Sequence, residues 1–324
     1  MSVSSKAPDI SFVIPSYQSE STIEWTLRSI RGQETSLSYE IVVVHSSPGS
    51  LPAALETDYP ELQLVRSSHR LWPGAARNLG AGRARGQWLA FVDADAVLER
   101  DWLECLHKRL QIHPDGMAGG RVANSNLGTD AGSVLHWLEF SEFLPDQRGG
   151  PRPFVSSSNL LIRRERFLET GGFDERLGMS EDAAFCRFYA GAVLFCPETG
   201  VRHRHRTDWR QVLTHLKGHG YWSGIYRRLY PAPGSFLAKW PVLSRLLPLW
   251  RLPRVVWRVC RSRPTETGKC LRLLPALWRG LVVWAGGFEE GLRKRICAGP
   301  YGRGDPGGRG VPPKSGHPKR LKRP

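Results

Sequence analysis

The stretch FVDADAV, residues 91–97, ends a hydrophobic run with two aspartates that a single alanine separates. Leu89 to Val92 is typical of a buried strand, and in an extended chain residues i and i+2 point to the same side. If the extended geometry continues, the carboxylates of Asp93 and Asp95 face the same space and repel by about 4 kcal/mol at an effective dielectric constant of about 20. A divalent ion such as Mg²⁺ or Mn²⁺ would offset this repulsion and prefers oxygen ligands. The simpler alternative is a solvated turn in which Asp95 caps the following segment.

The flanking sequence alternates short apolar segments with amphipathic ones, which favours a sheet with helices on its faces. Strands are expected at residues 9–17, 39–47, 62–68 and 87–93, and helices at 19–33, 74–86, 100–114, 131–144 and 180–192. The predicted fold class is therefore α/β with a mostly parallel central sheet. Ligands of such sheets bind at the carboxyl ends of the strands. The pattern places the two aspartates there, together with the residues 15–17 and 45–46.

Four segments, in this order along residues 9–225, resemble a family-2 glycosyltransferase with the GT-A fold. They are SFVIPSYQSESTIEWTLRSIRGQ (11–33), GAARNLGAGRARGQWLAFVDAD (74–95), SSSNLLIRRERFLETGGFDERLGMSED (156–182) and VRHRHRT (201–207). Each motif is short, so the signal lies in their order and spacing.

The resemblance implies that a sugar moves, with inversion, from a nucleoside-diphosphate donor to an acceptor hydroxyl. It implies that Asp95, and more distantly Asp93, hold a Mg²⁺ or Mn²⁺ ion that stabilises the charge on the leaving diphosphate. Asp182 occupies the position of the general base that accepts the hydroxyl proton, and Glu181 is expected to orient Asp182 or to contact the acceptor. Considered alone, SED (180–182) would also suit a helix N-terminus, where acids are favourable.

Further site residues follow from the same resemblance. The edge that binds the nucleoside is matched by Pro15, Ser16, Tyr17 and Glu20. Arg77 matches a helix arginine near the two aspartates. His203 or His205 matches a late histidine that reaches the metal or the diphosphate, and His203 is favoured because it follows the apolar strand more closely.

One position departs from the family pattern. The strand at 39–47 contains His45 where the family usually has an aspartate that contacts the nucleotide base. A neutral histidine can still donate and accept a hydrogen bond, so His45 remains a candidate nucleoside contact and the identity of the nucleotide stays open. Because His45 departs from the family pattern, a catalytically inactive homologue that binds a sugar nucleotide is an alternative.

Charge is distributed unevenly along the chain. Residues 1–199 contain 19 Lys/Arg and 25 Asp/Glu, a net charge of −6, whereas residues 200–324 contain 27 and 5, a net charge of +22. Residues 226–300 mix Trp and Leu with Arg, and the apolar run GLVVWAGGF (280–288) is shorter than the ~20 residues that span a bilayer. This pattern predicts proline-divided amphipathic helices on an anionic membrane surface. Helices that merely pack on the catalytic domain are the alternative.

The expected organisation is a catalytic domain at 1–225, a basic amphipathic region at 226–300 and a disordered basic tail at 301–324.

No secretory signal is predicted at the start of the sequence, and the cysteines form no C-x-x-C pair, which indicates reduced thiols in the cytosol. The expected location is therefore cytoplasmic, peripheral on the inner face of the cell membrane, with a membrane-proximal or lipid-linked acceptor.

Two other classes of function stay open. A basic C-terminal half would suit a nucleic-acid-binding protein, but the tail from residue 301 has a single aromatic residue, Tyr301, whereas such proteins stack bases on aromatic side chains. No nucleic-acid partner is therefore expected. A nucleotidyltransferase would usually have a Gly-rich phosphate loop after its first strand, and PSYQSE (15–20) contains no glycine.

Overall fold

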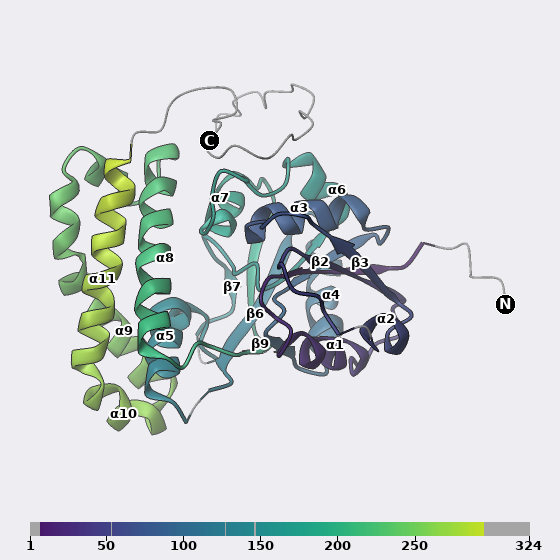
Figure 1. Cartoon of the computed structure of the whole chain (residues 1–324), viewed down its shortest axis with the longest axis horizontal. Coiled ribbons are helices and arrows are strands. Elements are labelled where there is room, and N and C mark those ends of the chain that lie inside the picture. Colours follow the sequence, from purple (N-terminus) through teal and green to yellow (C-terminus); the bar gives the residue numbers. More distant parts are fainter. Residues whose placement is uncertain (1–6, 53, 127, 146, 295–324) are drawn as a thin grey trace. The chain divides into compact units, whose positions relative to one another are not determined.

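The computed structural model describes residues 7–294 except 53, 127 and 146 (Figure 1). Its strands are β1 (Ile10–Ser16), β2 (Tyr39–His45), β3 (Leu62–Arg66), β4 (Trp88–Val92), β5 (Ala96–Leu98), β6 (Met117–Asn124), β7 (Gly150–Pro151), β8 (Asn159–Arg163) and β9 (Val193–His203). Its α-helices are α1 (Ile23–Arg31), α2 (Ala54–Asp58), α3 (Pro73–Arg83), α4 (Trp102–Ile112), α5 (Asp130–Phe140), α6 (Arg164–Glu169), α7 (Glu181–Phe188), α8 (Trp209–Leu229), α9 (Leu247–Ser262), α10 (Thr267–Arg272) and α11 (Leu274–Arg293). Short 3₁₀ segments are η1 (Ser141–Phe143), η2 (Ser235–Ala238), η3 (Pro241–Leu246) and η4 (Pro264–Glu266).

The strands of the described residues form one sheet in the order β3-β2-β1-β4-β8-β6-β9-β5, with β7 paired to β9. The first four are parallel neighbours, and β6 pairs in parallel with β9. β8 runs antiparallel to both β4 and β6, while β5 and β7 run antiparallel to β9. The prediction of an α/β fold with a mostly parallel central sheet is confirmed.

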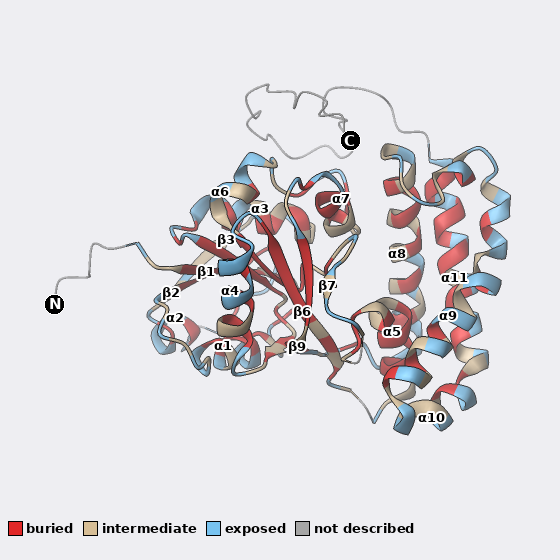
Figure 2. Cartoon of the chain, turned by 180° about the vertical axis from the view of Figure 1, so that it is seen from behind, coloured by how far each residue is buried: buried red, intermediate tan, exposed pale blue. Residues whose placement is uncertain are grey.

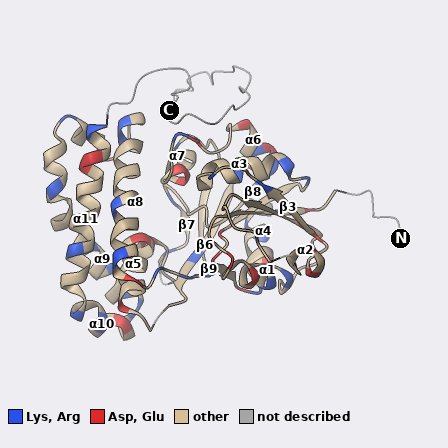
Figure 3. Ribbon diagram, in the orientation of Figure 1, with Lys and Arg blue, Asp and Glu red and all other residues tan. Residues whose placement is uncertain are grey.

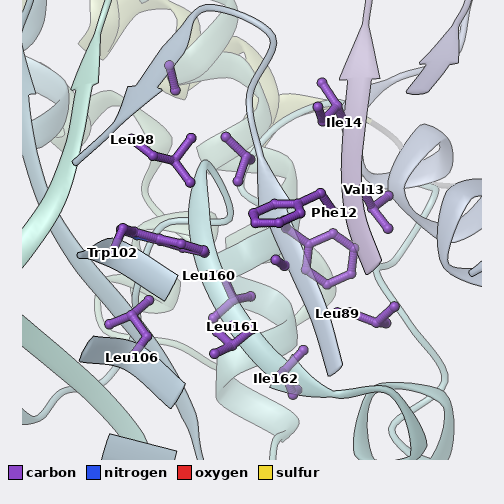
Figure 4. Close-up of a cluster of buried hydrophobic side chains, with 14 of the residues drawn as sticks. Phe12, Val13, Ile14, Leu89, Leu98, Trp102, Leu106, Leu160, Leu161 and Ile162 are labelled. Atoms are coloured by element: carbon purple, nitrogen blue, oxygen red, sulfur yellow. The ribbon is translucent and has the colours of Figure 1, made fainter. Parts of the chain in front are cut away.

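Helices cover both faces of the parallel half, which explains why Ile41 to Val44 of β2 are all apolar and fully buried. On β1, Phe12 faces α4, where its ring centroid lies 6.2 Å from that of Trp102 (Figure 4). The next residue, Val13, points to the opposite face and meets α3. A Cβ on Gly80 would lie 2.5 Å from Val13 Cγ1, so a glycine is needed for α3 to approach the sheet this closely.

The chain turns directly after β4, so the extended geometry expected through Ala94 does not continue. Residues 94 and 95 lie in a turn, in which the Ala96 N–H donates to the Asp93 carbonyl oxygen (3.2 Å). β5 then pairs with the end of β9 and sets Ala96 opposite His203. The turn and this pairing, rather than alternation along one strand, bring the two aspartates to the same site.

The helices α8 and α11 cross at backbone contact. Each carries two glycines four residues apart: Gly220 and Gly224 on α8, Gly287 and Gly291 on α11. A Cβ on Gly220 would lie 2.0 Å from the carbonyl oxygen of Trp284, and one on Gly291 would lie 2.0 Å from that of Tyr221. This crossing therefore requires glycine, and it ties α11 to α8.

The region after α8 is helical, as predicted. Its prolines begin η3 (Pro241), lie in the first turns of α9 and α11 (Pro248 and Pro275) or lie inside α9 (Pro253). The buried faces of α9 and α11 pack together with α5 and α8 in one apolar cluster (Figure 2). The boundary expected between residues 225 and 226 falls inside α8, and residues up to Arg293 belong to one compact unit. No helix within 7–294 is both long and apolar enough to cross a bilayer.

Several predicted helices are observed with shorter bounds. The helix expected at 19–33 begins at Ile23, α3 ends at Arg83 rather than at Gly86, and the helix expected at 180–192 ends at Phe188. Free thiols are present at Cys105, Cys186, Cys196, Cys260 and Cys270. Cys297 and the predicted tail at 301–324 lie outside the described residues.

Candidate active site

A cavity of about 1540 Å³ opens at the carboxyl ends of β1, β2 and β4. Ser16, Ser46 and Asp95 are among the strand-end residues that line it, and residues 156–158 and 178–183 line a second wall. Its other end is lined by α8, α9 and α11. The cavity thus lies where ligands of open α/β sheets bind.

Asp93, Asp95 and His203 form the one group in the described part of the chain in which three metal-ligating side chains have their ligand atoms within 4.8 Å of one another. His203 Nε2 lies 3.2 Å from Asp95 Oδ1 and 3.5 Å from Asp93 Oδ2. The β5–β9 pairing explains this proximity, because it sets His203 beside the aspartate turn. Of the two histidines that the sequence left open, His203 is the one that reaches the aspartates.

The donor set fits a divalent cation in ligand number and type, since Mn²⁺ accepts carboxylate oxygen and imidazole nitrogen. Burial opposes protonation of His203, but the charges of Asp95 and Asp93 outweigh it and raise the pKa of His203 to about 9. Burial also raises the pKa of Asp95, and the nearby Asp93 charge adds to this effect. Negative charge contributes to both shifts, as the main cause for His203 and as a smaller one beside burial for Asp95, and a cation would neutralise it.

Arg77 connects the aspartate turn to the SED segment, although 104 residues separate it from Glu181. Its guanidinium donates to Asp93 Oδ1 (2.5 Å) and to Glu181 Oε1 (2.7 Å), and the residue is 2% exposed. Burial would raise the pKa of Asp93, but the charge of Arg77 and the hydrogen bond from His203 prevail and lower it to about 2. Arg77, which the sequence placed near the two aspartates, therefore binds one of them and also Glu181, and so joins two acids.

The second wall carries the two acids that begin α7. Ser180, which precedes them, has a φ of +67° in the left-handed region, so the chain bends sharply into the helix. Asp182 accepts from the backbone N–H of the next residue (2.7 Å) and of Ser157 (3.4 Å). Burial raises the pKa of Asp182, and burial together with the Asp182 charge raises that of Glu181 to about 7. Both acids line the cavity, but Glu181 is buried against the arginine, whereas Asp182 is half-buried and the more accessible of the two.

The positions matched to the nucleoside edge lie at the same end of the cavity. Three of them line it: Pro15, Ser16 and Tyr17. Glu20 is exposed and is not among the described lining residues. Sequence reasoning missed Arg70, which lies 4.5 Å from the Tyr17 ring centroid and 4.6 Å from that of Trp72. The Trp72 ring in turn meets Trp222 of α8 at 5.5 Å.

His45 is buried and engaged on both ring nitrogens. Nδ1 lies 2.8 Å from Ser16 Oγ, and Nε2 lies 2.7 Å from the Gly49 carbonyl oxygen. A carbonyl only accepts, so Nε2 carries the proton and the Ser16 hydroxyl donates to Nδ1. His45 is not among the described lining residues, whereas Ser46 is. This geometry places the histidine to hold the following loop against β1 and does not support the predicted contact with the base.

Sequence reasoning also missed a histidine-rich wall beside His203. His205 stacks on His203 with 4.8 Å between ring centroids, and its Nε2 lies 3.0 Å from Nδ1 of His136. His215 Nε2 lies 2.6 Å from Glu139 Oε1. His205 belongs to the motif VRHRHRT (201–207), but His136 and Glu139 of α5 and His215 of α8 lie outside any motif. The one local signal for them is the i, i+4 pair of histidines in HLKGH (215–219).

A mostly parallel α/β sheet with an acid–acid–histidine group at its strand ends, linked by a buried arginine to a second acid pair, defines the class of GT-A sugar-nucleotide transferases. Comparison with known proteins gives the family. Residues 11–171 match the model of Glycosyl transferase family 2, and the chain belongs to this family of transferase enzymes.

Two curated relatives illustrate the range of similarity. Succinoglycan biosynthesis protein ExoO of Rhizobium meliloti is 32% identical over 197 residues, which cover 55% of this chain and 54% of that protein. Pre-mycofactocin glycosyltransferase of Mycobacterium tuberculosis is 26% identical over 315 residues, which cover 89% of this chain and 64% of that protein. The chain thus spans between half and two thirds of the length of these relatives.

Among solved structures, the mannosyltransferase PcManGT from Pyrobaculum calidifontis, in complex with GDP-Man and Mn²⁺, superposes with a TM-score of 0.58. It is 19% identical, and the match covers 88% of each chain. At this identity the likeness shows a shared fold.

Proposed function

We propose that the chain transfers a sugar, with inversion at the anomeric carbon, from a nucleoside-diphosphate sugar to an acceptor hydroxyl, and that Asp93, Asp95 and His203 hold a Mg²⁺ or Mn²⁺ ion. The observation that carries the proposal is that one cavity contains this three-residue group and the accessible carboxylate of Asp182. The Mn²⁺ and GDP-Man in the mannosyltransferase of the same fold support the choice of ion and of donor class.

Each residue then has a definite task. We assign the nucleoside to Tyr17 and Ser46, which line the cavity at the strand ends. When bound, the cation supplies positive charge against the charge that develops on the leaving diphosphate. Asp182 accepts the proton of the acceptor hydroxyl as the new glycosidic bond forms. Glu181 acts through its neighbours, because its bond to Arg77 fixes the start of α7 relative to the aspartate turn.

A panel of sugar nucleotides tests this proposal. The purified chain is incubated with each donor and Mn²⁺, and donor hydrolysis and protection against heat are recorded. The proposal requires at least one donor that is hydrolysed or protective only when the ion is present. If no donor gives either signal, the function lies elsewhere.

We expect Asp95→Ala to weaken the Mn²⁺-dependent part of donor binding about tenfold or more, about 1.4 kcal/mol. The reason is the loss of one of two carboxylate ligands, and isothermal titration with and without Mn²⁺ measures it. The melting temperature should stay constant or rise, because the repulsion from Asp93 is removed. Asp58→Ala, at an exposed position of α2, is the matched control. A variant that keeps the full Mn²⁺ effect would argue against this metal site.

We also propose that η3 and α9 rest on the anionic inner face of the cell membrane. Large apolar side chains are exposed there at Trp240, Leu246, Leu249, Trp250 and Trp257. Arginines accompany them: Arg254 lies 4.0 Å from the Trp250 ring centroid and Arg261 lies 5.6 Å from that of Trp257. Basic residues recur along the C-terminal helices (blue in Figure 3). Aromatic and basic side chains on one helical face are typical of helices in the membrane interface.

Vesicle co-sedimentation of the full-length protein checks the membrane proposal. Each basic residue near an anionic surface contributes about 1 kcal/mol, which salt screens, whereas inserted apolar side chains resist salt. We therefore expect Leu249→Ser/Trp257→Ser to abolish the salt-resistant part of the binding to anionic vesicles. Ile112→Ser/Leu168→Ser, which changes two exposed apolar residues of α4 and α6, should bind like the wild type. Equal sedimentation of both double variants, or a soluble wild type, would show that these helices only pack on the protein.

A further inference from the structure

The end of the cavity away from the strand ends has a floor of two stacked rings, Trp284 and Phe288 of α11, with centroids 5.0 Å apart. The guanidinium carbon of Arg251 lies 4.0 Å from the Trp284 centroid, and that of Arg227 lies 5.2 Å from the Phe288 centroid. All four residues line the cavity. Two positive charges from α8 and α9 therefore meet over adjoining rings.

Neither arginine has a carboxylate within ion-pair distance in the described part of the chain. Arg227 donates to the carbonyl oxygens of Ser223 and Pro233, both at 3.0 Å. Arg251 donates to the carbonyl oxygen of Leu138 at 3.3 Å. Backbone carbonyls leave the positive charges of these two half-buried arginines without a counter-charge, and a charge that is partly removed from water is costly when it is unpaired.

The acids that act on Arg251 are already engaged. Glu139 pairs with His215, and Glu142 pairs with Arg258 at 2.8 Å. Burial lowers the pKa of Arg251 to about 10, and the positive charge of Arg227 adds to this effect. The two guanidiniums thus stand in a desolvated place and close enough to repel each other.

A third donor in the same place also lacks an acceptor. The indole Nε1 of Trp284 is buried without a hydrogen-bond partner, and the residue is 6% exposed. Buried polar groups are nearly always hydrogen-bonded, so an orphaned N–H in a cavity wall indicates a missing acceptor. Two guanidiniums and an indole N–H without an acceptor thus belong to residues that line this end of the cavity, and the kind of group that fits them is an anion rich in oxygen.

The cavity wall next to these donors is apolar. Phe236, Leu247, Trp250 and Val255 contribute to it. Phe236 and Trp250 are 65% and 60% exposed, so the apolar wall continues to the protein surface. A ligand that filled this end would carry an anionic group inside and an apolar chain leading out.

We propose that Arg227, Arg251 and Trp284, here called the anion pocket, bind a phosphate of the acceptor whose apolar chain lies along Phe236 and Trp250. A phosphate suits two guanidiniums better than a carboxylate does, because it offers more oxygens and up to two negative charges. The anion pocket opens into the same cavity as Asp182, so an acceptor held there lies in the compartment where its hydroxyl would be deprotonated. This assignment rests on the proposed glycosyl transfer and specifies the acceptor as an amphiphilic phosphate ester.

Farnesyl phosphate, farnesol and inorganic phosphate separate the two parts of the proposal. Binding is followed by titration calorimetry and by quenching of tryptophan fluorescence. We expect farnesyl phosphate to bind at least tenfold more tightly than either farnesol or inorganic phosphate. Equal affinity of farnesol would overturn the anion pocket, and equal affinity of inorganic phosphate would overturn the role of the apolar wall.

Variants locate the binding. Arg251→Met and Arg227→Met should each weaken farnesyl phosphate about tenfold, and Trp284→Phe should weaken it several-fold while keeping a ring at the floor. Arg279→Met, at an exposed position of α11, is the matched control and should bind like the wild type. If Arg251→Met binds farnesyl phosphate like this control, the anion pocket is not the site.

The panel of sugar nucleotides distinguishes a failure of the anion pocket from a failure of the proposed glycosyl transfer. A wild type that hydrolyses a donor but shows no anion-dependent binding of farnesyl phosphate disproves the anion pocket alone. A wild type that responds to no donor disproves the glycosyl transfer on which the acceptor role rests. Heat protection of each arginine variant by the active donor and Mn²⁺ shows that the variant is folded.

Discussion

Asp182→Asn should lower the rate of sugar transfer by a factor of about 10² or more while donor binding stays within error of the wild type. Asparagine keeps the shape of the side chain and can accept the backbone hydrogen bond from Ser157. It cannot take up a proton, and a positioned general base contributes about 10²–10⁴ to the rate. Initial rates at saturating donor and Mn²⁺, with titration of the donor, measure the two quantities separately. Asp115→Asn, at an exposed position, is the control.

The pH dependence of the wild type provides a second test of the same residue. Burial raises the pKa of Asp182 above its ordinary value. The base must be ionised to accept a proton, so transfer should already fall at a pH above the usual pKa of a carboxylate. An ordinary carboxylate would lose activity only near its usual pKa of about 4. A rate that is flat down to pH 5, or an Asp182→Asn enzyme of near-normal rate, would place the base elsewhere.

The sequence predicted the parallel half of the sheet correctly, because each of its strands is a short apolar run that can be recognised without knowing its neighbours. Apolar runs such as that of β2 follow from burial on both faces, and the place of the aspartates follows from where β4 ends. A turn after Asp93 was the alternative to an extended chain, and the sequence could not decide between them, because the form of this segment depends on the pairing of β5 with β9 about 100 residues later. The same pairing decides between His203 and His205, which the sequence alone could not.

Residues that act through long-range contacts were assigned less well. Arg77 was expected near the two aspartates and does bind Asp93, but no spacing in the sequence reveals its second partner, Glu181. His45 occupies a nucleoside position, but bonds to Ser16 and Gly49 engage its ring. The basic C-terminal half of the sequence indicated a membrane surface. That two of its arginines, Arg227 and Arg251, line the cavity depends on how α8, α9 and α11 pack, which no sequence pattern shows.

Arg77→Met should lower the free energy of unfolding by about 3–5 kcal/mol, the usual cost of removing one partner from a buried ion pair. The substitution leaves the buried Glu181 and the half-buried Asp93 without their shared cation. Urea denaturation of both proteins at pH 7 measures the difference. Arg83→Met, at an exposed position of the same helix α3, should change stability by less than about 0.5 kcal/mol.

The origin of this loss can be checked by varying the pH, because the sign is fixed by the pKa of Asp93. Burial would raise that pKa, but Arg77 and His203 lower it to about 2, below the ordinary value of 3.8. In the wild type the resulting stability is present above the ordinary pKa and is lost as the pH falls towards 2. Arg77→Met lacks the arginine's contribution to this stability at every pH. The difference in free energy of unfolding between the wild type and the variant should therefore narrow as the pH falls below 3.8. If this difference in free energy does not change with pH, the arginine stabilises the fold through packing of its aliphatic stem rather than through its charge. If Arg77→Met is as stable as Arg83→Met, the bridge from Arg77 to the two acids contributes nothing to stability.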